Sequence, residues 1–224
     1  MKYLFRISVL IMAICLMHSC RKDEVPDTVT DINGNVYHTV IIGTQVWMIE
    51  NLKTTKYRDG SNIPLVTGYT DWMRLTTPGY CWYDNDRGTY KETYGALYNW
   101  HAVIAGKLCP TCWHIPTDEE WVVLMEYLGG SVVAGGKLKE TGTAHWNSPN
   151  TGATNETGFA ALAGGNRGID GSFYMMGRRG SWWSVTEYNA WSAKSMNIDY
   201  DDDEMKDIAY GKTNGMSARC IMDY

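Results

Sequence analysis

The chain has 224 residues, of which 44% are hydrophobic and 20% are charged, and its formal net charge is -5. This share of apolar residues excludes a disordered chain, and the acidic balance argues against a nucleic-acid ligand, whose phosphates would require a basic face. The aromatic residues are biased, with 10 Trp and 15 Tyr against 3 Phe, toward rings that carry a polar group and suit partly wet positions.

The first twenty residues have the pattern of a secretory signal. Lys2 and Arg6 flank the start of an apolar run at 7–17, and the small residue Ser19 precedes Cys20. The run is too short for a membrane-spanning helix, which takes about 20 apolar residues. Because the end of the signal resembles a bacterial lipobox, we expect cleavage after Ser19 and lipidation of Cys20. Ordinary cleavage, with Cys20 left as a thiol, is the alternative.

A charged segment follows the signal. Its first residues, Arg21-Lys22-Asp23-Glu24, resemble the basic-then-acidic signal that directs Bacteroidetes lipoproteins to the outer face of the outer membrane. The alternative is a solvated charged linker. We therefore predict a lipoprotein signal peptide at 1–19, a charged linker at 20–30 and one domain at 31–224. The protein is expected to be anchored in the outer membrane by its lipid and exposed at the surface.

The domain is predicted to open with strands. Residues 31–35 contain Asn33-Gly34, which favours a type I′ hairpin turn. The segments 36–42 and 45–52 then have the composition of strands, joined around a second glycine-containing turn.

Two helices are predicted next. The first covers 96–105, and the second begins after Thr117, whose hydroxyl forms a capping box with Glu120, and ends at Gly129. The apolar stripes are Leu97, Trp100, His101 and Ile104 in the first helix, and Trp121, Leu124, Met125 and Leu128 in the second.

The remaining chain predicts a long loop region and then more strands. Residues 130–180 are rich in Gly, Asn, Ser and Thr, a composition typical of ordered loops with a function. Four strands are expected after them, at 181–187, 191–198, 205–212 and 216–221. Strands, helices, loops and strands in this order indicate an α+β fold with an antiparallel sheet.

Several sequence blocks, in order, resemble the Fibrobacter succinogenes major paralogous domain over about residues 31–223. They include Gly34-Asn35-Val36-Tyr37, Gln45-Val46-Trp47-Met48, Cys81-Trp82-Tyr83-Asp84-Asn85-Asp86, Tyr94-Gly95-Ala96-Leu97-Tyr98-Asn99-Trp100, Trp113-His114-Ile115-Pro116-Thr117 and Ala218-Arg219-Cys220. That family is distantly similar to C-type-lectin-like and formylglycine-generating-enzyme-like domains. The resemblance implies a C-type-lectin-like α+β fold, with an antiparallel sheet, two helices and a long Gly/Asn-rich loop region. It also implies a surface lipoprotein, since members typically are such proteins without an assigned activity.

The pair Cys109 and Cys112 has the spacing of a redox dithiol. That chemistry needs the first cysteine at a helix N-terminus, and here four residues separate the pair from the helix start. A zinc site could add His101 or His114, but a structural site needs four ligands and no second close pair follows. Neither site is favoured.

Disulfide bonds are the favoured state of the four cysteines of the domain, because an extracellular compartment is oxidising. Cys81, Cys109, Cys112 and Cys220 allow three pairings. The resemblance implies Cys109–Cys220, since these match the usual cysteine positions of the family, and this leaves Cys81–Cys112.

An acidic run could offer oxygen ligands to calcium. It comprises Asp199, Asp201, Asp202, Asp203 and Glu204. The order of residues does not follow an EF-hand loop, so a solvated hairpin tip is favoured, and we expect neither a metal nor a cofactor.

The loop region supplies the candidate ligand-binding residues. They are Trp146, Asn147, Asn166, Arg167 and Tyr174. Sugars stack on aromatic rings and bond to amides, so the set could form a shallow site for a glycan or a peptide. For Trp146, packing of the loops onto the core is the favoured alternative.

These observations favour a non-enzymatic surface lipoprotein with a lectin-like binding or adhesion role, whose ligand is a polysaccharide or a surface protein. A structural component of a surface or pilus assembly is one alternative. A formylglycine-generating oxidase is a weaker one, because the enzymes need a close cysteine pair near the C-terminus and only Cys220 lies there. No catalytic residue is therefore assigned.

Overall fold

The computed structural model describes residues 25–223. The signal peptide, the lipidation of Cys20 and the charged signal at 21–24 lie outside the described residues and stay predictions. Within the described residues, no helix has the length and apolar composition that crossing a membrane requires.

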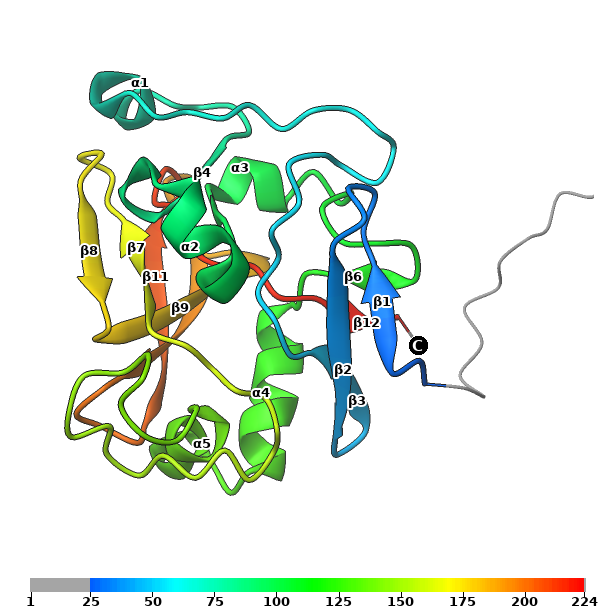
Figure 1. The fold of residues 1–224 in the computed structure, drawn as a ribbon, viewed down its shortest axis with the longest axis vertical. Coiled ribbons are helices and arrows are strands. Elements are labelled where there is room, and N and C mark those ends of the chain that lie inside the picture. The colour runs from blue at the N-terminus through cyan, green and yellow to red at the C-terminus, as the bar shows by residue number, and fades with distance from the viewer. Residues whose placement is uncertain (1–24, 224) are drawn as a thin grey trace, which may run out of the picture.

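Short helices and twelve strands alternate along the described chain (Figure 1). The helices are α1 (Tyr69–Met73), a 3-10 turn (Tyr83–Asn85), α2 (Arg87–Tyr94), α3 (Trp100–Val103), α4 (Asp118–Tyr127) and α5 (Ser131–Leu138). The strands are β1 (Thr28–Thr30), β2 (Val36–Ile42), β3 (Gln45–Met48), β4 (Tyr80–Cys81), β5 (Leu97–Tyr98), β6 (Trp113–His114), β7 (Gly164–Arg167), β8 (Phe173–Met176), β9 (Arg179–Glu187), β10 (Ser192–Asp199), β11 (Met205–Gly211) and β12 (Ile221–Met222).

The strands form four antiparallel groups. The largest has the order β1-β2-β3-β12-β6, and a second has the order β11-β10-β9. Two further pairs, β4 with β5 and β7 with β8, complete the set among the described residues. The predicted mixture of helices with mostly antiparallel sheets is confirmed.

The first hairpin is confirmed, but its turn type is wrong. Gly34 has a positive φ of 81°, whereas Asn33 is not among the residues with positive φ, and a type I′ turn needs both. The Asp31 carboxylate accepts the backbone N–H groups of Asn33 and Asn35, which stabilises this different loop. The predicted linker also ends early, because Thr28–Thr30 pair with β2.

Of the two predicted helices, α4 is confirmed in detail. The Thr117 hydroxyl accepts the Glu120 N–H, and the Glu120 side chain accepts the Thr117 N–H. The other prediction, 96–105, holds only for α3, since Leu97 and Tyr98 are extended and pair with β4. The reason is Asn99, whose side chain caps α3 by accepting the Ala102 N–H and so begins the helix later.

Helix α5 lies inside the predicted loop region. Its glycines, Gly135 and Gly136, favour a loop in the sequence but are required here by close packing. A Cβ on Gly135 would lie 2.7 Å from the backbone oxygen of Glu204, and one on Gly136 would lie 2.5 Å from that of Gly152. The region also holds the β7–β8 hairpin and the first two residues of β9, and the rest of it is irregular.

Two of the three hydrophobic clusters of the described residues lie on opposite faces of β9. Because successive strand residues point to opposite faces, Trp182 packs in one cluster and Trp183 in the other. Nine of the 10 Trp residues are buried, so most of the tryptophan content of the chain belongs to the core. The exception is Trp191, which is 84% exposed at the tip of the β9–β10 hairpin.

One predicted disulfide is confirmed and the other is wrong. Cys109 and Cys220 are bonded inside the cluster that contains Trp183. Cys81 is a free, buried thiol, so the Cys81–Cys112 bridge does not exist. The two residues belong to different parts of the core, since Cys81 packs beside Trp72 while Cys112 packs on the disulfide's cluster. Burial raises the pKa of the Cys81 thiol to about 12, which keeps it protonated and unreactive.

Candidate functional site

A buried arginine holds two loops together at one end of the β7–β8 hairpin. The Arg167 guanidinium donates to the backbone oxygens of Val66 and Thr67, at 2.7 and 3.0 Å. Its Nε donates to Gly171 at 2.9 Å. The guanidinium also stacks over Trp72, at 4.5 Å from the ring centroid. Because these bonds join α1 and its preceding loop to the hairpin, Arg167 fixes the surface above it.

Two exposed tyrosines lie on that surface. Tyr69 comes from α1 and is 52% exposed, and Tyr174 comes from β8 and is 43% exposed. Between them, the β7–β8 loop supplies Asp170, which accepts the Tyr174 hydroxyl, and Ser172, which donates to the Tyr69 hydroxyl at 3.3 Å. We call these four residues the tyrosine site. The Asp170 pKa is lowered, chiefly by the Tyr174 hydrogen bond, so the site carries a carboxylate at neutral pH.

Glycines let the two rings rest on the loop backbone. A Cβ on Gly171 would lie 3.2 Å from the Tyr69 ring, and one on Gly168 would lie 2.8 Å from the Tyr174 ring. Gly171 also has a positive φ of 82°, which glycine adopts without strain. The glycines that favour a loop in the sequence therefore serve the close approach of two aromatic rings.

The structure separates the predicted ligand-binding residues. Asn166 and Tyr174 are paired across β7 and β8, with Tyr174 exposed and Asn166 half-buried. Trp146 and Arg167 are buried and therefore offer no surface to a ligand; the Trp146 Nε1 donates to Ala161. Asn147 is exposed, but lies beside Gly177 at the other end of the hairpin.

Three residues of the tyrosine site were missed by the sequence argument. Asp170 and Ser172 follow Arg167 closely and sit in a Gly-Ser turn, so their position beside Tyr174 could have been predicted from a β7–β8 hairpin. Tyr69 could not, because it lies about a hundred positions earlier and reaches the site only through the bonds of Arg167 to its loop.

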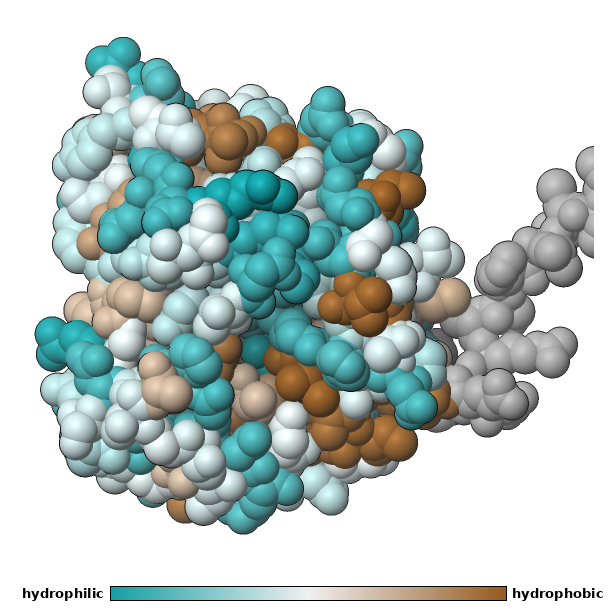
Figure 2. Space-filling model, in the orientation of Figure 1, coloured by the Kyte–Doolittle hydropathy of each residue, from teal (hydrophilic) through white to brown (hydrophobic). Residues whose placement is uncertain are grey.

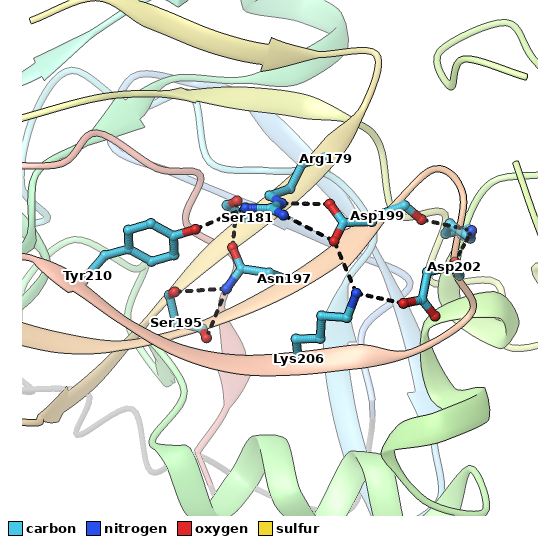
Figure 3. Close-up of polar contacts among 9 residues, drawn as sticks. Arg179, Ser181, Ser195, Asn197, Asp199, Asp202, Lys206 and Tyr210 are labelled. Atoms are coloured by element: carbon cyan, nitrogen blue, oxygen red, sulfur yellow. Dashed lines mark hydrogen bonds and ion pairs between the residues drawn. The ribbon is translucent and has the colours of Figure 1, made fainter.

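The acidic run forms the tip of the β10–β11 hairpin, as predicted, but it is tied down by cations. Asp199 binds Arg179 through two oxygens and Lys206 through one, and Lys206 also binds Asp202 at 2.6 Å (Figure 3). The Lys206 ammonium lowers the pKa of Asp202. Among the described residues, no group of three or more His, Cys, Asp or Glu side chains could hold a metal ion.

A second polar cluster surrounds His114 at the end of β6. Its Nδ1 lies 2.6 Å from Asp223 Oδ1, and its Nε2 lies 2.8 Å from Glu120 Oε1. The hydrogen bond to Glu120 raises the pKa of His114, and the bond to Asp223 adds to this effect against the cost of burial. The His114 imidazole therefore links the C-terminal residues to the capping box of α4.

This cluster should make stability depend on pH. A histidine whose pKa is raised by folding stabilises fully below its unfolded value, near 6.5, and loses that contribution as pH rises through the raised value. We expect His114→Gln to cost more free energy of unfolding at pH 6 than at pH 9, as measured by urea denaturation. When Asp223 is also replaced by Asn, the cost of His114→Gln should differ less between pH 6 and pH 9, because one of the two carboxylate partners is gone. An equal cost at both pH values would contradict the assignment.

The sequence comparisons give one result. A search of the curated proteins and a search of the solved structures gave no match. The family model of the Fibrobacter succinogenes major domain matches residues 40–222, which is most of the chain and includes α4, the disulfide and the tyrosine site. The chain therefore belongs to the Fibrobacter succinogenes major domain family.

Proposed function

We propose that this protein is a lipid-anchored cell-surface protein that binds an extracellular polysaccharide at the tyrosine site, on a C-type-lectin-like scaffold. The observation that supports it is the pair of exposed rings, Tyr69 and Tyr174, with a carboxylate and a hydroxyl between them. No catalytic step is part of the proposal.

The chemistry of the site suits a sugar. A pyranose ring has an apolar face that packs on a tyrosine ring, and its hydroxyls are both donors and acceptors. Asp170 offers a carboxylate acceptor, and Ser172 offers a hydroxyl that can do either. The fixed loop reduces the ordering cost of binding, because Arg167 already holds the backbone beneath both rings.

The position of the site also suits a surface protein. In Figure 1, α1 and β8 lie on the left, whereas the chain leaves the described residues on the right, beside β1. An anchor at Cys20 would therefore attach at the side away from the tyrosine site, and the site would face outward.

A glycan array with the purified full-length protein tests the proposal. Tyr174→Ala and Tyr69→Ala should each weaken binding by about tenfold or more, which corresponds to about 1.4 kcal/mol. Tyr188→Ala is the matched control, because Tyr188 is also exposed but lies on the β9–β10 hairpin, outside the site. Binding that all three variants retain, or no glycan bound above background, would contradict the proposal.

A further inference from the structure

A second surface, at the end of the β2–β3 hairpin, exposes two large side chains that are wholly or partly apolar. Ile41 is 60% exposed and Tyr127 is 65% exposed. The Tyr127 ring lies against the hairpin turn, since a Cβ on Gly43 would lie 2.8 Å from it. We call the surface formed by Val25, Ile41, Gly43 and Tyr127 the β2–β3 face. Figure 2 shows hydrophobic residues gathered on this lower right side of the molecule.

Two shallow hollows flank Ile41. One is lined by Val25, Val46 and Met222 together with Asp223, and the other by Tyr127 and Leu128 together with Glu156. The two carboxylates at the borders have partners, since Asp223 lies 2.6 Å from the His114 imidazole and Glu156 binds Lys137 at 3.1 Å.

The length of the chain before this face indicates what covers it. Val25 is part of the face, and five residue steps separate it from Cys20. Five residues span at most roughly 18 Å, even when fully extended. A domain of this size has a radius of gyration of roughly 16 Å and is wider than the tether is long. A lipid on Cys20 therefore keeps the β2–β3 face close to the bilayer.

We propose that the β2–β3 face lies on the outer-membrane surface, with Ile41 and Tyr127 in the interfacial region of the lipid. This inference rests on the proposed lipid anchor but concerns a different surface from the tyrosine site. Tyrosine is enriched at membrane interfaces because its ring is apolar and its hydroxyl is polar, which matches the exposed position of Tyr127. Docking fixes the orientation of the domain and holds the tyrosine site outward.

Hydrogen exchange of the full-length lipidated protein in phosphatidylethanolamine–phosphatidylglycerol vesicles tests this inference. We expect amides of 41–46 to exchange at least about fivefold more slowly in vesicles than in soluble Cys20→Ala protein, with 168–174 unchanged. Ile41→Ser with Tyr127→Ser should remove the protection. Ile169→Ser is the matched control, because Ile169 is also exposed but lies on the β7–β8 loop.

Three outcomes would overturn the inference. If mass spectrometry finds no acyl group on Cys20, the proposed anchor fails and the docking fails with it. If Cys20 is acylated but the turn exchanges equally fast in vesicles, only the docking fails. If the protection in vesicles survives Ile41→Ser with Tyr127→Ser, these two side chains do not dock the face on the lipid.

Discussion

Removing the Cys109–Cys220 disulfide, by replacing both cysteines with alanine, is expected to lower the free energy of unfolding by about 5 kcal/mol. The bond joins residues separated by 111 positions, and a cross-link of this span removes much conformational entropy from the unfolded chain. The chain-entropy model gives about 4.7 kcal/mol for a loop of 100 residues. Both cysteines are also buried in the cluster that contains Trp183, so the variant loses some packing as well.

Urea denaturation of the oxidised protein measures this effect. Cys81→Ala is the control, because Cys81 is buried but forms no disulfide, and it should cost about 1 kcal/mol, as an average core substitution does. Equal losses in the two variants would mean that the cross-link itself adds nothing to the free energy of unfolding. Reducing the disulfide of the wild-type protein should lower its free energy of unfolding by about as much as the double substitution does.

Local signals predict the parts of the fold in which neighbouring residues bond to each other. The capping box of α4 requires only Thr117 and Glu120, three residues apart, and it forms as predicted. The hairpin at 31–35 is similar, although the Asp31 carboxylate changes the turn type by binding backbone N–H groups. Such bonds lie within a few residues and leave a pattern that a sequence can show.

Packing between distant segments is the part that the sequence conceals. Gly135 and Gly136 favour a loop in the sequence, yet they lie in α5. These positions need glycine because the backbone of the β10–β11 connection and of Gly152 approaches them closely. Trp146 lies in a segment whose composition suggests a ligand-binding loop, but its side chain is in the core and its Nε1 donates to the Ala161 carbonyl. In both cases the deciding partner is a backbone atom, and a backbone atom is the same in every residue.

The tyrosine site illustrates the same limit. The prediction grouped Tyr174 and Asn166 with three other loop residues as ligand-binding candidates, and in the structure these two are paired in one hairpin. It also named Arg167 as a ligand-binding candidate, whereas the structure buries this side chain. Its partners are the carbonyls of Val66, Thr67 and Gly171, which have no signature in the sequence. The prediction therefore gave Arg167 a contact with the ligand, whereas in the structure it holds the backbone beneath the tyrosine site.

Arg167 is not the only buried cation that holds loops in place in the described part of this domain. Arg219 donates to the Phe159 carbonyl at 2.6 Å and stacks on the ring of the same residue, at 4.0 Å from its centroid. It also donates to the Asn51 side chain, which in turn accepts the Trp182 Nε1 at 2.8 Å. Arg167 and Arg219 thus both bind backbone carbonyls and pack on aromatic rings, which include Trp72 and Trp182.

Lys139→Met is expected to destabilise the protein by about 3 kcal/mol or more. The Lys139 side chain is fully buried just after α5, and its ammonium donates to Thr151 at 2.6 Å, Asp202 at 2.7 Å and Asp199 at 3.1 Å. All three acceptors are backbone oxygens, so methionine would keep the volume but leave them without this donor. Leaving a buried acceptor unpaired costs about 1–3 kcal/mol, and three of them share one donor here.

Lys137→Met provides a matched control two residues away. Lys137 is partly exposed and binds only Glu156, a surface pair that contributes about 0–1 kcal/mol. The same substitution at the two positions therefore separates the buried ammonium from the loss of a positive charge. Exchange of the amides at 150–153 and 200–204 should also speed up in Lys139→Met, because both segments lose their common tie. If the two variants unfold at the same urea concentration, Lys139 does not organise the loops, and their order must come from the close packing of α5 against the acidic hairpin.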